Sequence, residues 1–209
     1  MPVALVALAA VIAASQPNLA KLVLKPSAVG SGYVLMHRPD GVGTAQRTLD
    51  LCGTQNYPSE SLRQDRLQVD YGNSKIPLGL SNEVVTYKSG GAAKAMSEVA
   101  LHAKTCPNKA IAFEGQPPLV YHFTRVTDSK LLTGYLAYRI DISGKVKGKA
   151  VTVVRYAIYQ RFGNVLSGVY SYALAPGVPG AIQQAFVLHA AEASAKALRG
   201  ATPAGGLPA

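Results

Sequence analysis

This chain of 209 residues has no tryptophan, only two cysteines and only 15% charged residues, whereas 48% of its residues are hydrophobic. In an average globular protein about a quarter of the residues are charged, and disordered chains contain few apolar residues. The shortage of charge therefore excludes a disordered tail and favours a folded domain with a sizeable core. Among the charged residues the acidic ones are the scarcer. There are 11 Asp and Glu against 21 Lys and Arg, which gives a formal net charge of +10. This excess is spread along the chain and indicates an anionic partner or surface.

The N-terminal apolar run is too short to span a bilayer, which takes about 20 residues. It covers residues 3–14, VALVALAAVIAA, and is followed by polar residues and Pro17. The run has the length of the hydrophobic region of a signal peptide, and its small residues form a plausible cleavage zone. The basic residues that normally start such a peptide are missing or trimmed. We expect residues 1–15 to be a signal peptide, with a buried helix of the mature fold as the alternative.

The two cysteines, Cys52 and Cys106, allow only one intramolecular pairing. In an exported protein an even number of cysteines normally indicates disulfides. The bridge would close a loop of about 55 residues and stabilise the fold by about 4 kcal/mol. Because neither cysteine lies in a CxxC motif or beside a histidine pattern, we expect no catalytic or metal-binding role for them.

Alternating and helical patterns divide the middle of the chain into strands and one helix. From Arg63 to Tyr71 the residues alternate between polar and apolar, which is typical of a half-buried strand, and residues 83–87 predict a second strand. Residues 92–105 have apolar side chains at helical spacing and predict a helix that ends near Cys106. After Pro107, β-branched and aromatic runs separated by turn residues predict strands. These runs cover residues 110–114, 119–126, 134–142, 150–162 and 164–174.

A second helix is expected from Pro179 to about Leu198, closed by Gly200 and followed by a flexible tail at residues 201–209. Its expected apolar stripe consists of Ile182, Ala185, Phe186, His189, Ala190, Ala193 and Ala197.

Short connections between the strands imply antiparallel neighbours, and strands that do not alternate regularly with helices are typical of the α+β class. We therefore predict a single domain over residues 20–200. Its expected architecture is an antiparallel β-sheet with two main helices packed on one face.

Motifs for catalysis or metal binding are absent from the sequence. No pair among His37, His102, His122 and His189 has a metal-ligand spacing, and we expect His122 and His189 to be partly buried structural residues. The G-x-S-x-G frame of serine hydrolases does not occur. Residues 143–150, SGKVKGKA, depart from the phosphate-loop pattern and predict a hairpin tip with solvated lysines.

Acidic residues near the first predicted strand alternate with basic ones. Glu60, Asp65 and Asp70 are interleaved with Arg63 and Arg66. Their spacing predicts local ion pairs and gives no support to an acid–base pair for catalysis.

Arginine and tyrosine recur at alternate positions of the later strands and form the candidate ligand site. Within each strand, alternation places Arg139 with Tyr135, and Arg155 with Tyr159 and Arg161. We expect these positions to meet on one sheet face, with Tyr170 beside them; an ordinary solvated face is the alternative. Guanidinium groups and aromatic rings together hold anions or sugars. The candidate ligand-binding residues are Arg125, Tyr135, Arg139, Arg155, Tyr159 and Arg161.

Four segments occur in an order that resembles exported actinobacterial sensor-like domains. They are LVLKP at 22–26, VGSGY at 29–33, TLDLCG at 48–53 and RFGNVL at 161–166. The family is that of the extracellular domain of the mycobacterial receptor kinase PknH, and the resemblance covers most of residues 20–200. It implies an antiparallel sheet with helices against one side and a cleft on the other that binds an unidentified ligand.

These observations predict a secreted or cell-envelope protein that acts as a non-enzymatic, sensor-like ligand-binding domain. The expected partner is an anionic or amphiphilic small molecule, lipid or glycan of the envelope, with the membrane surface or an envelope protein as alternatives. We expect a monomer with no metal, no cofactor and no nucleic-acid partner. Two other functions stay open. One is an extracellular hydrolase in which His122 or His37 meets a carboxylate and a hydroxyl only in three dimensions, and the other is a structural protein-contact module.

Overall fold

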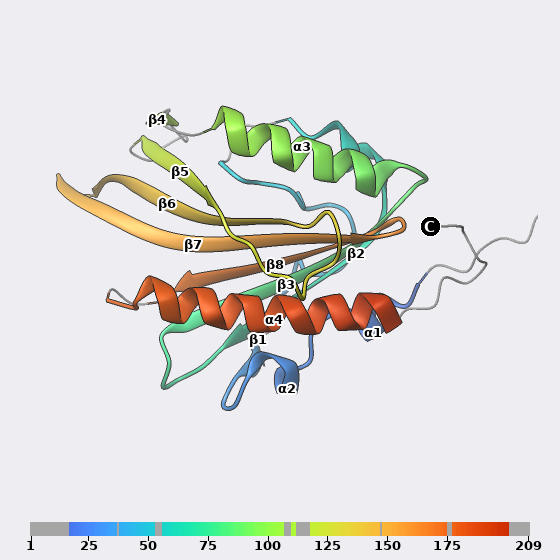
Figure 1. Cartoon of the computed structure of the whole chain (residues 1–209), viewed down its shortest axis with the longest axis horizontal. Helices are drawn as coiled ribbons and strands as arrows, with labels where there is room; N and C mark the ends of the chain where they lie inside the picture. The colour runs from blue at the N-terminus through green and yellow to red at the C-terminus, as the bar shows by residue number, and fades with distance from the viewer. Residues whose placement is uncertain are drawn as a thin grey trace, which may run out of the picture.

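The computed structural model describes residues 17–36, 38–52, 56–106, 110–111, 118–146, 148–174 and 177–200. The expected signal peptide (1–15) and the expected tail (201–209) lie outside the described residues. The described strands form one eight-stranded antiparallel sheet in the order β1-β2-β3-β8-β7-β6-β5-β4 (Figure 1). The predicted antiparallel α+β fold is confirmed.

Most strands agree closely with the sequence prediction, and β3 and β6 are longer than expected. The sheet consists of β1 (Val34–Met36), β2 (Arg63–Gly72), β3 (Leu78–Tyr87), β4 (Ala110–Ile111), β5 (Leu119–Arg125), β6 (Leu136–Val146), β7 (Lys149–Phe162) and β8 (Val165–Ala173). The helices are α1 (Leu19–Leu22), α2 (Pro26–Val29), the 3₁₀ helix η1 (Pro58–Leu62), α3 (Gly91–Thr105) and α4 (Gly180–Gly200).

Two meanders make up the sheet. Strands β1 to β3 form the first and β4 to β8 form the second, and they join where β3 pairs with β8, for example at Ser81 and Tyr170. Helix α3 connects the two meanders in the sequence. Strands β6 and β7 form a long hairpin that closes at the pair Val146–Lys149, which confirms the predicted hairpin tip.

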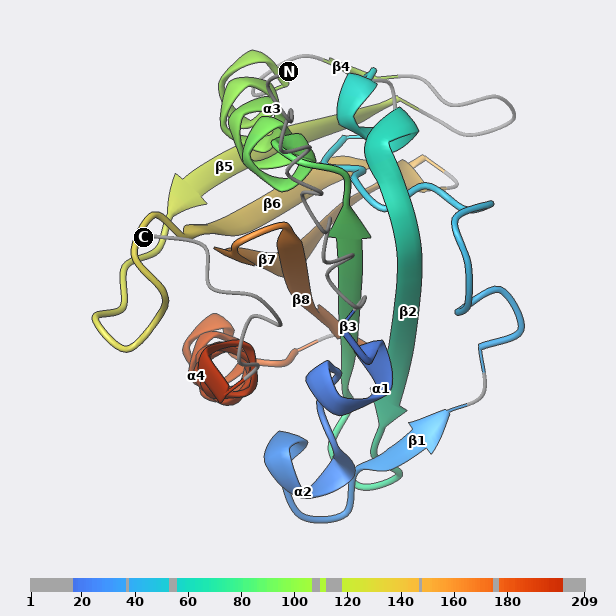
Figure 2. The same cartoon turned by 90° about the vertical axis from the view of Figure 1, so that its right-hand side faces the viewer.

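The two long helices lie on opposite faces of the sheet, so the prediction that both pack on one face is wrong (Figure 2). Val99 of α3 packs in one core with Tyr159 of β7, whereas Val187 of α4 packs in another core with Ile158. Neighbouring residues of a strand point to opposite faces, so Tyr159 and Ile158 mark two different faces. We call these the α3 face and the α4 face.

Strand β3 explains why helices are needed on both faces. All ten of its residues are buried, including Leu80 on the α4 face and Val85 on the α3 face. A strand that is buried on both sides must be covered on both sides, as in sheets with helices on each face. The resemblance to sensor-like domains had implied helices on one side only.

Helix α3 buries the residues that have helical spacing in the sequence, Ala92, Met96, Val99 and Ala103, whereas the stripe predicted for α4 has only Ala190 buried. In α4 the residue Ile182 is 56% exposed and His189 is also exposed. The buried face instead contains two polar residues that make hydrogen bonds: Gln183 Nε2 donates to the Val154 carbonyl at 3.1 Å, and Ser194 Oγ shares a 2.8 Å bond with Ser167 Oγ. The buried residues of α4 are Gln183, Val187, Ala190, Ala191, Ser194, Ala195 and Leu198.

The predicted disulfide joins Cys52 to Cys106, with a Cα–Cα distance of 6.4 Å that suits the bond. It ties the C-terminal end of α3 to the chain that leads into η1. Among the helices of the described residues, none combines the length and apolar character needed to cross a membrane.

Candidate functional site

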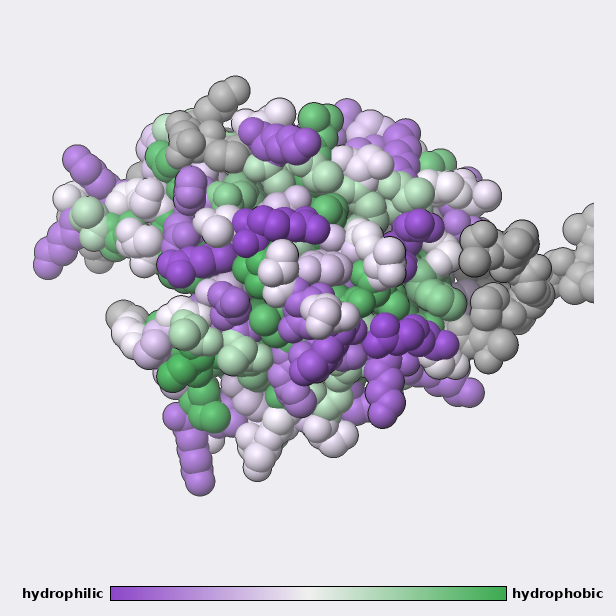
Figure 3. Space-filling view, viewed as in Figure 1, coloured by the Kyte–Doolittle hydropathy of each residue, from purple (hydrophilic) through white to green (hydrophobic). Residues whose placement is uncertain are grey.

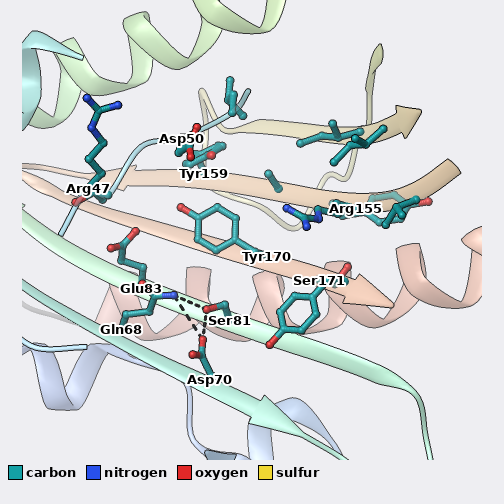
Figure 4. A pocket seen from close by; sticks show the side chains of 18 of the residues that line it. Arg47, Asp50, Gln68, Asp70, Ser81, Glu83, Arg155, Tyr159, Tyr170 and Ser171 are labelled. Atoms are coloured by element: carbon teal, nitrogen blue, oxygen red, sulfur yellow. Dashed lines mark hydrogen bonds between the residues drawn. The ribbon is translucent and has the colours of Figure 1, made fainter. Parts of the chain in front are cut away.

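A groove of about 560 Å³ lies on the α3 face, beyond the part of the sheet that α3 covers (Figure 4). Strands β2, β3, β8, β7 and β6 contribute to it, and the segment around residues 47–51 borders it. The groove therefore crosses the junction between the two meanders.

A hydrogen-bonded row of polar side chains forms one wall of the groove, on β2 and β3. Gln68 Nε2 donates to Ser81 Oγ at 2.7 Å, and the Ser81 hydroxyl donates to Asp70. Arg38 completes the row with an ion pair to Asp70 at 3.0 Å. The hydrogen bonds among Gln68, Ser81 and Asp70 are visible in Figure 4.

Beside this wall lies a buried ion pair between Arg66 and Glu83, both less than 5% exposed. The Arg66 guanidinium also donates to the Asp40 carbonyl at 2.9 Å and to the Gln68 side-chain oxygen. Burial raises the pKa of Glu83 to about 7, against the opposing effect of the Arg66 charge. A continuous polar network thus runs from the buried pair to the groove surface.

The local ion pairs expected near β2 form only in part. Arg63 pairs with Glu60 at 2.9 Å, as expected. Asp70 and Arg66 instead take partners that are distant in sequence, because β2 lies against β3 and against the segment that contains Arg38.

The opposite wall of the groove is apolar. It is formed by Ile140 and Ile142 of β6 and by Val153 of β7, with Leu51 nearby. Ile140 and Ile142 are buried, whereas Val153 is exposed at one end of the groove. One side of the groove therefore offers hydrogen-bonding groups, and the other side offers hydrocarbon.

Tyrosine rings lie between the two walls, above glycines that leave room for them. The ring of Tyr172 lies where a side chain on Gly79 would be. The Tyr170 hydroxyl likewise occupies the space where a side chain on Gly168 would be. The rings of Tyr159 and Tyr170 meet edge to face, with 5.6 Å between centroids. Burial raises the pKa of both tyrosines well above the usual value, so they keep their phenolic protons.

Two exposed arginines border the groove, Arg47 and Arg155. Neither forms an ion pair with any carboxylate of the described residues, unlike Arg38 and Arg66. Arg155 lies on the apolar side, opposite Ile140 in the register of β6 and β7. These two guanidinium groups are the cations that the site leaves available to an anion.

The six predicted ligand residues do not share a face, so this part of the prediction is wrong. Arg139 pairs with Tyr156 in the sheet register and lies on the α4 face, where its Nη2 makes a 2.8 Å ion pair with Asp141. Tyr135 precedes β6, and its hydroxyl accepts a hydrogen bond from the Asp128 N–H at 2.7 Å. Both residues are outside the groove.

Arg125 and Arg161 are on the α3 face but also outside the groove. The Arg125 guanidinium lies over the rings of Tyr135 and Tyr138, at 5.4 and 5.3 Å. Arg161 is exposed and donates to the Gly163 carbonyl. Of the six candidates, the groove brings together Arg155 and Tyr159.

The polar wall on β2 and β3 and Arg47 were not among the residues predicted from the sequence. Gln68 and Asp70 lie on the same side of a strand by alternation, and Ser81 and Glu83 repeat this pattern on the next strand. This polar alternation on two consecutive strands is the signal that could have located the groove.

No histidine of the described residues lines the groove, and these residues contain no cluster of three or more His, Cys, Asp or Glu that could hold a metal ion. His122 and His189 are exposed, so the expectation that they are partly buried is wrong. His102 contacts the Tyr57 ring. His37 lies outside the described residues.

No protein-family model matches the chain, and no curated protein matches it in sequence. In structure it is similar to the extracellular domain of PknH from Mycobacterium tuberculosis, with a TM-score of 0.51 and 12% sequence identity. The match covers 87% of this chain and 98% of that domain. At this identity the likeness shows a shared fold, which confirms the resemblance at that level.

Proposed function

We propose that this protein is a sensor-like binding domain that acts outside the cytoplasm and captures an anionic amphiphile of the cell envelope in the groove on the α3 face. The observation that carries the proposal is that Arg47 and Arg155, which form no ion pair within the part of the chain that the structure describes, border a groove with one polar and one apolar wall.

The two walls suit a molecule with a polar group and a hydrocarbon part. Ile140, Ile142 and Val153 would contact hydrocarbon, and each Å² of apolar surface removed from water contributes about 25 cal/mol. Gln68 and Asp70 offer hydrogen bonds to hydroxyl groups on the opposite side. A purely polar metabolite would leave the apolar wall without a partner.

Arg155 supports an anionic group on this ligand. Its guanidinium is exposed at the groove beside apolar side chains, so it is accessible to the anionic group of a bound amphiphile. Guanidinium groups bind carboxylates and phosphates through two parallel hydrogen bonds. Arg47 lies on the segment that borders the same groove, toward its other end (Figure 4), and offers a second cation to a ligand that fills the groove.

The fold and the disulfide support a location outside the cytoplasm. Structural disulfides persist in oxidising compartments, and the similar structure is described as an extracellular domain. The non-enzymatic nature of the domain is part of the proposal, since no catalytic constellation with a histidine lines the groove among the described residues.

Binding of lysophosphatidylglycerol below its micelle concentration, compared with lysophosphatidylcholine, tests the proposal. We expect the anionic lipid to bind and the zwitterionic one to bind at least tenfold more weakly. The Arg47→Ala, Arg155→Ala double variant should lose roughly 100-fold or more in affinity for the anionic lipid, because a charged hydrogen bond contributes about 1.5–3 kcal/mol.

Two control variants separate the groove from the general basic charge. Arg161→Ala removes an exposed arginine from the same strand and face, and Arg139→Ala removes one from the opposite face. Both should bind like the wild type. Equal losses of affinity in all variants would contradict the proposal. Cleavage of the lipid, monitored by mass spectrometry, would instead indicate that the protein is a hydrolase.

A further inference from the structure

Exposed apolar side chains gather at one end of the molecule, where the β6–β7 hairpin projects. They are Ile76 in the β2–β3 connection, Val153 on β7, Leu174 after β8 and Ile182 at the start of α4. Hydrogen bonds show that these segments are neighbours. The Leu174 N–H donates to the Pro77 carbonyl at 2.8 Å, and the side chain next to Ile182, Gln183, donates to the Val154 carbonyl. We call this region the hairpin end.

Exposed lysines lie at the same end of the molecule as these apolar side chains. Lys75 adjoins Ile76, and Lys145 and Lys149 lie near the tip of the β6–β7 hairpin. This tip extends beyond β8, because β7 pairs with β6 up to Lys149 but with β8 only up to Arg155 (Figure 1). Figure 3 shows hydrophilic and hydrophobic side chains side by side at this end, at the left.

Little acidic charge offsets the lysines of the hairpin. The only acidic residue of β6 is Asp141, and it already pairs with Arg139 at 2.8 Å. The hairpin end therefore combines exposed lysines with exposed apolar side chains. Isolated exposed apolar residues are common, but several at one end, together with cations, indicate an interaction surface.

We propose that the hairpin end docks on the surface of an anionic lipid membrane. Lysines close to an anionic bilayer contribute about 1 kcal/mol each, and side chains such as isoleucine and leucine enter the headgroup region. The four apolar residues come from four separate segments at one end of the molecule. This arrangement suits a soft lipid surface, where each side chain inserts independently, and does not form a continuous strip for a partner helix.

The proposal is independent of ligand capture in the groove, although Val153 belongs to both regions. Lys75, Lys145 and Lys149 do not line the groove. A domain docked in this way would bring the open end of its groove near Val153 to the surface where membrane amphiphiles are found.

Tryptophan fluorescence gives a direct test, because the chain contains no tryptophan. Ile182→Trp introduces a single reporter at the hairpin end, and Leu101→Trp introduces one on α3; both native side chains are 56% exposed. With vesicles of equimolar phosphatidylglycerol and phosphatidylcholine, emission of the Ile182→Trp variant should shift to the blue and the Leu101→Trp variant should not. Vesicles of pure phosphatidylcholine should shift neither.

A charge test uses co-sedimentation with the same vesicles. Lys75→Gln with Lys149→Gln should weaken partition roughly 30-fold, at roughly fivefold per lysine. The matched control, Lys88→Gln with Lys94→Gln, removes the same charge near the start of α3, at the opposite end of β3, and should change partition much less.

The outcomes separate this proposal from the one for the groove. Equal losses in the two lysine pairs, or no blue shift of the Ile182→Trp variant, would overturn docking by the hairpin end. Loss of vesicle binding in the Arg47→Ala, Arg155→Ala variant alone would overturn it as well and would assign lipid binding to the groove. Binding to an acidic protein but not to anionic vesicles would overturn membrane docking and would indicate a protein interface at the hairpin end.

Discussion

Glu83 is a buried carboxyl group that pairs with the buried Arg66. Burial raises its pKa to about 7 from an ordinary 4.5, so the folded protein holds this proton where the unfolded chain loses it. The stability that protonation provides is complete below pH 4.5 and is lost as the pH rises to about 7. We expect the free energy of unfolding to fall by about 3 kcal/mol over this range.

Denaturant titrations of the wild type and of Glu83→Gln between pH 4.5 and 7.5 measure this effect. The glutamine cannot ionise, so its curve should lack the decrease that Glu83 causes. All other side chains are common to the two proteins, so the difference between the curves isolates Glu83. Parallel curves for the two proteins would show that Arg66 keeps Glu83 ionised throughout.

Gly79 has no side chain, and the Tyr172 ring occupies the space where one would lie. The glycine therefore allows this ring to pack against the strand. Gly79→Val should push this ring off the strand and cost about 1–3 kcal/mol, as overpacking does. Adding Tyr172→Ala should recover part of the loss, and a double-mutant cycle in urea measures the coupling. Additive effects would mean that the two residues do not compete for this space.

At the scale of elements, the disulfide fixes the C-terminal end of α3 to a segment that has little regular structure. Replacing both cysteines by serine should lower the free energy of unfolding by about 4 kcal/mol, since the closed loop is long. Thermal unfolding with and without reductant checks this. A reduced wild type as stable as the oxidised one would contradict it.

The sequence predicts the extent of most elements but not how neighbouring strands align. Alternation correctly grouped Arg155 with Tyr159 within β7, because it depends on one strand alone. Whether Arg139 joins them depends on the register of β6 against β7, which the hairpin closure at Val146–Lys149 determines. A shift of one residue moves a whole side of a strand to the other face.

Helix α4 shows a second limit of pattern-based prediction. The predicted stripe used apolar residues only, whereas Gln183 and Ser194 lie on the buried face because Val154 and Ser167 satisfy their hydrogen bonds. Such partners are distant in sequence. The polar wall of the groove was missed for the same reason, since its members acquire a common function only when β2 and β3 pair.

For the whole molecule, two cores share one sheet. Leu80 belongs to the core under α4, and Leu166 belongs to the core under α3, each on a central strand. Leu80→Ala and Leu166→Ala should each cost about 3 kcal/mol. Because β3 and β8 serve both cores, each variant should still unfold in one transition, seen alike by far-ultraviolet circular dichroism and tyrosine absorbance. Two separated transitions would show that the faces unfold independently.

The junction between β3 and β8 also has a consequence for folding. It joins residues 78–86 to residues 165–173, whereas the other named strand pairs of the described sheet consist of strands that follow one another in the sequence. Contacts over such separations form slowly, because a long loop must close first. The groove draws its polar wall from the first meander and its apolar wall from the second. We therefore expect the site to form only after the two meanders have met, so that binding competence marks the completion of folding.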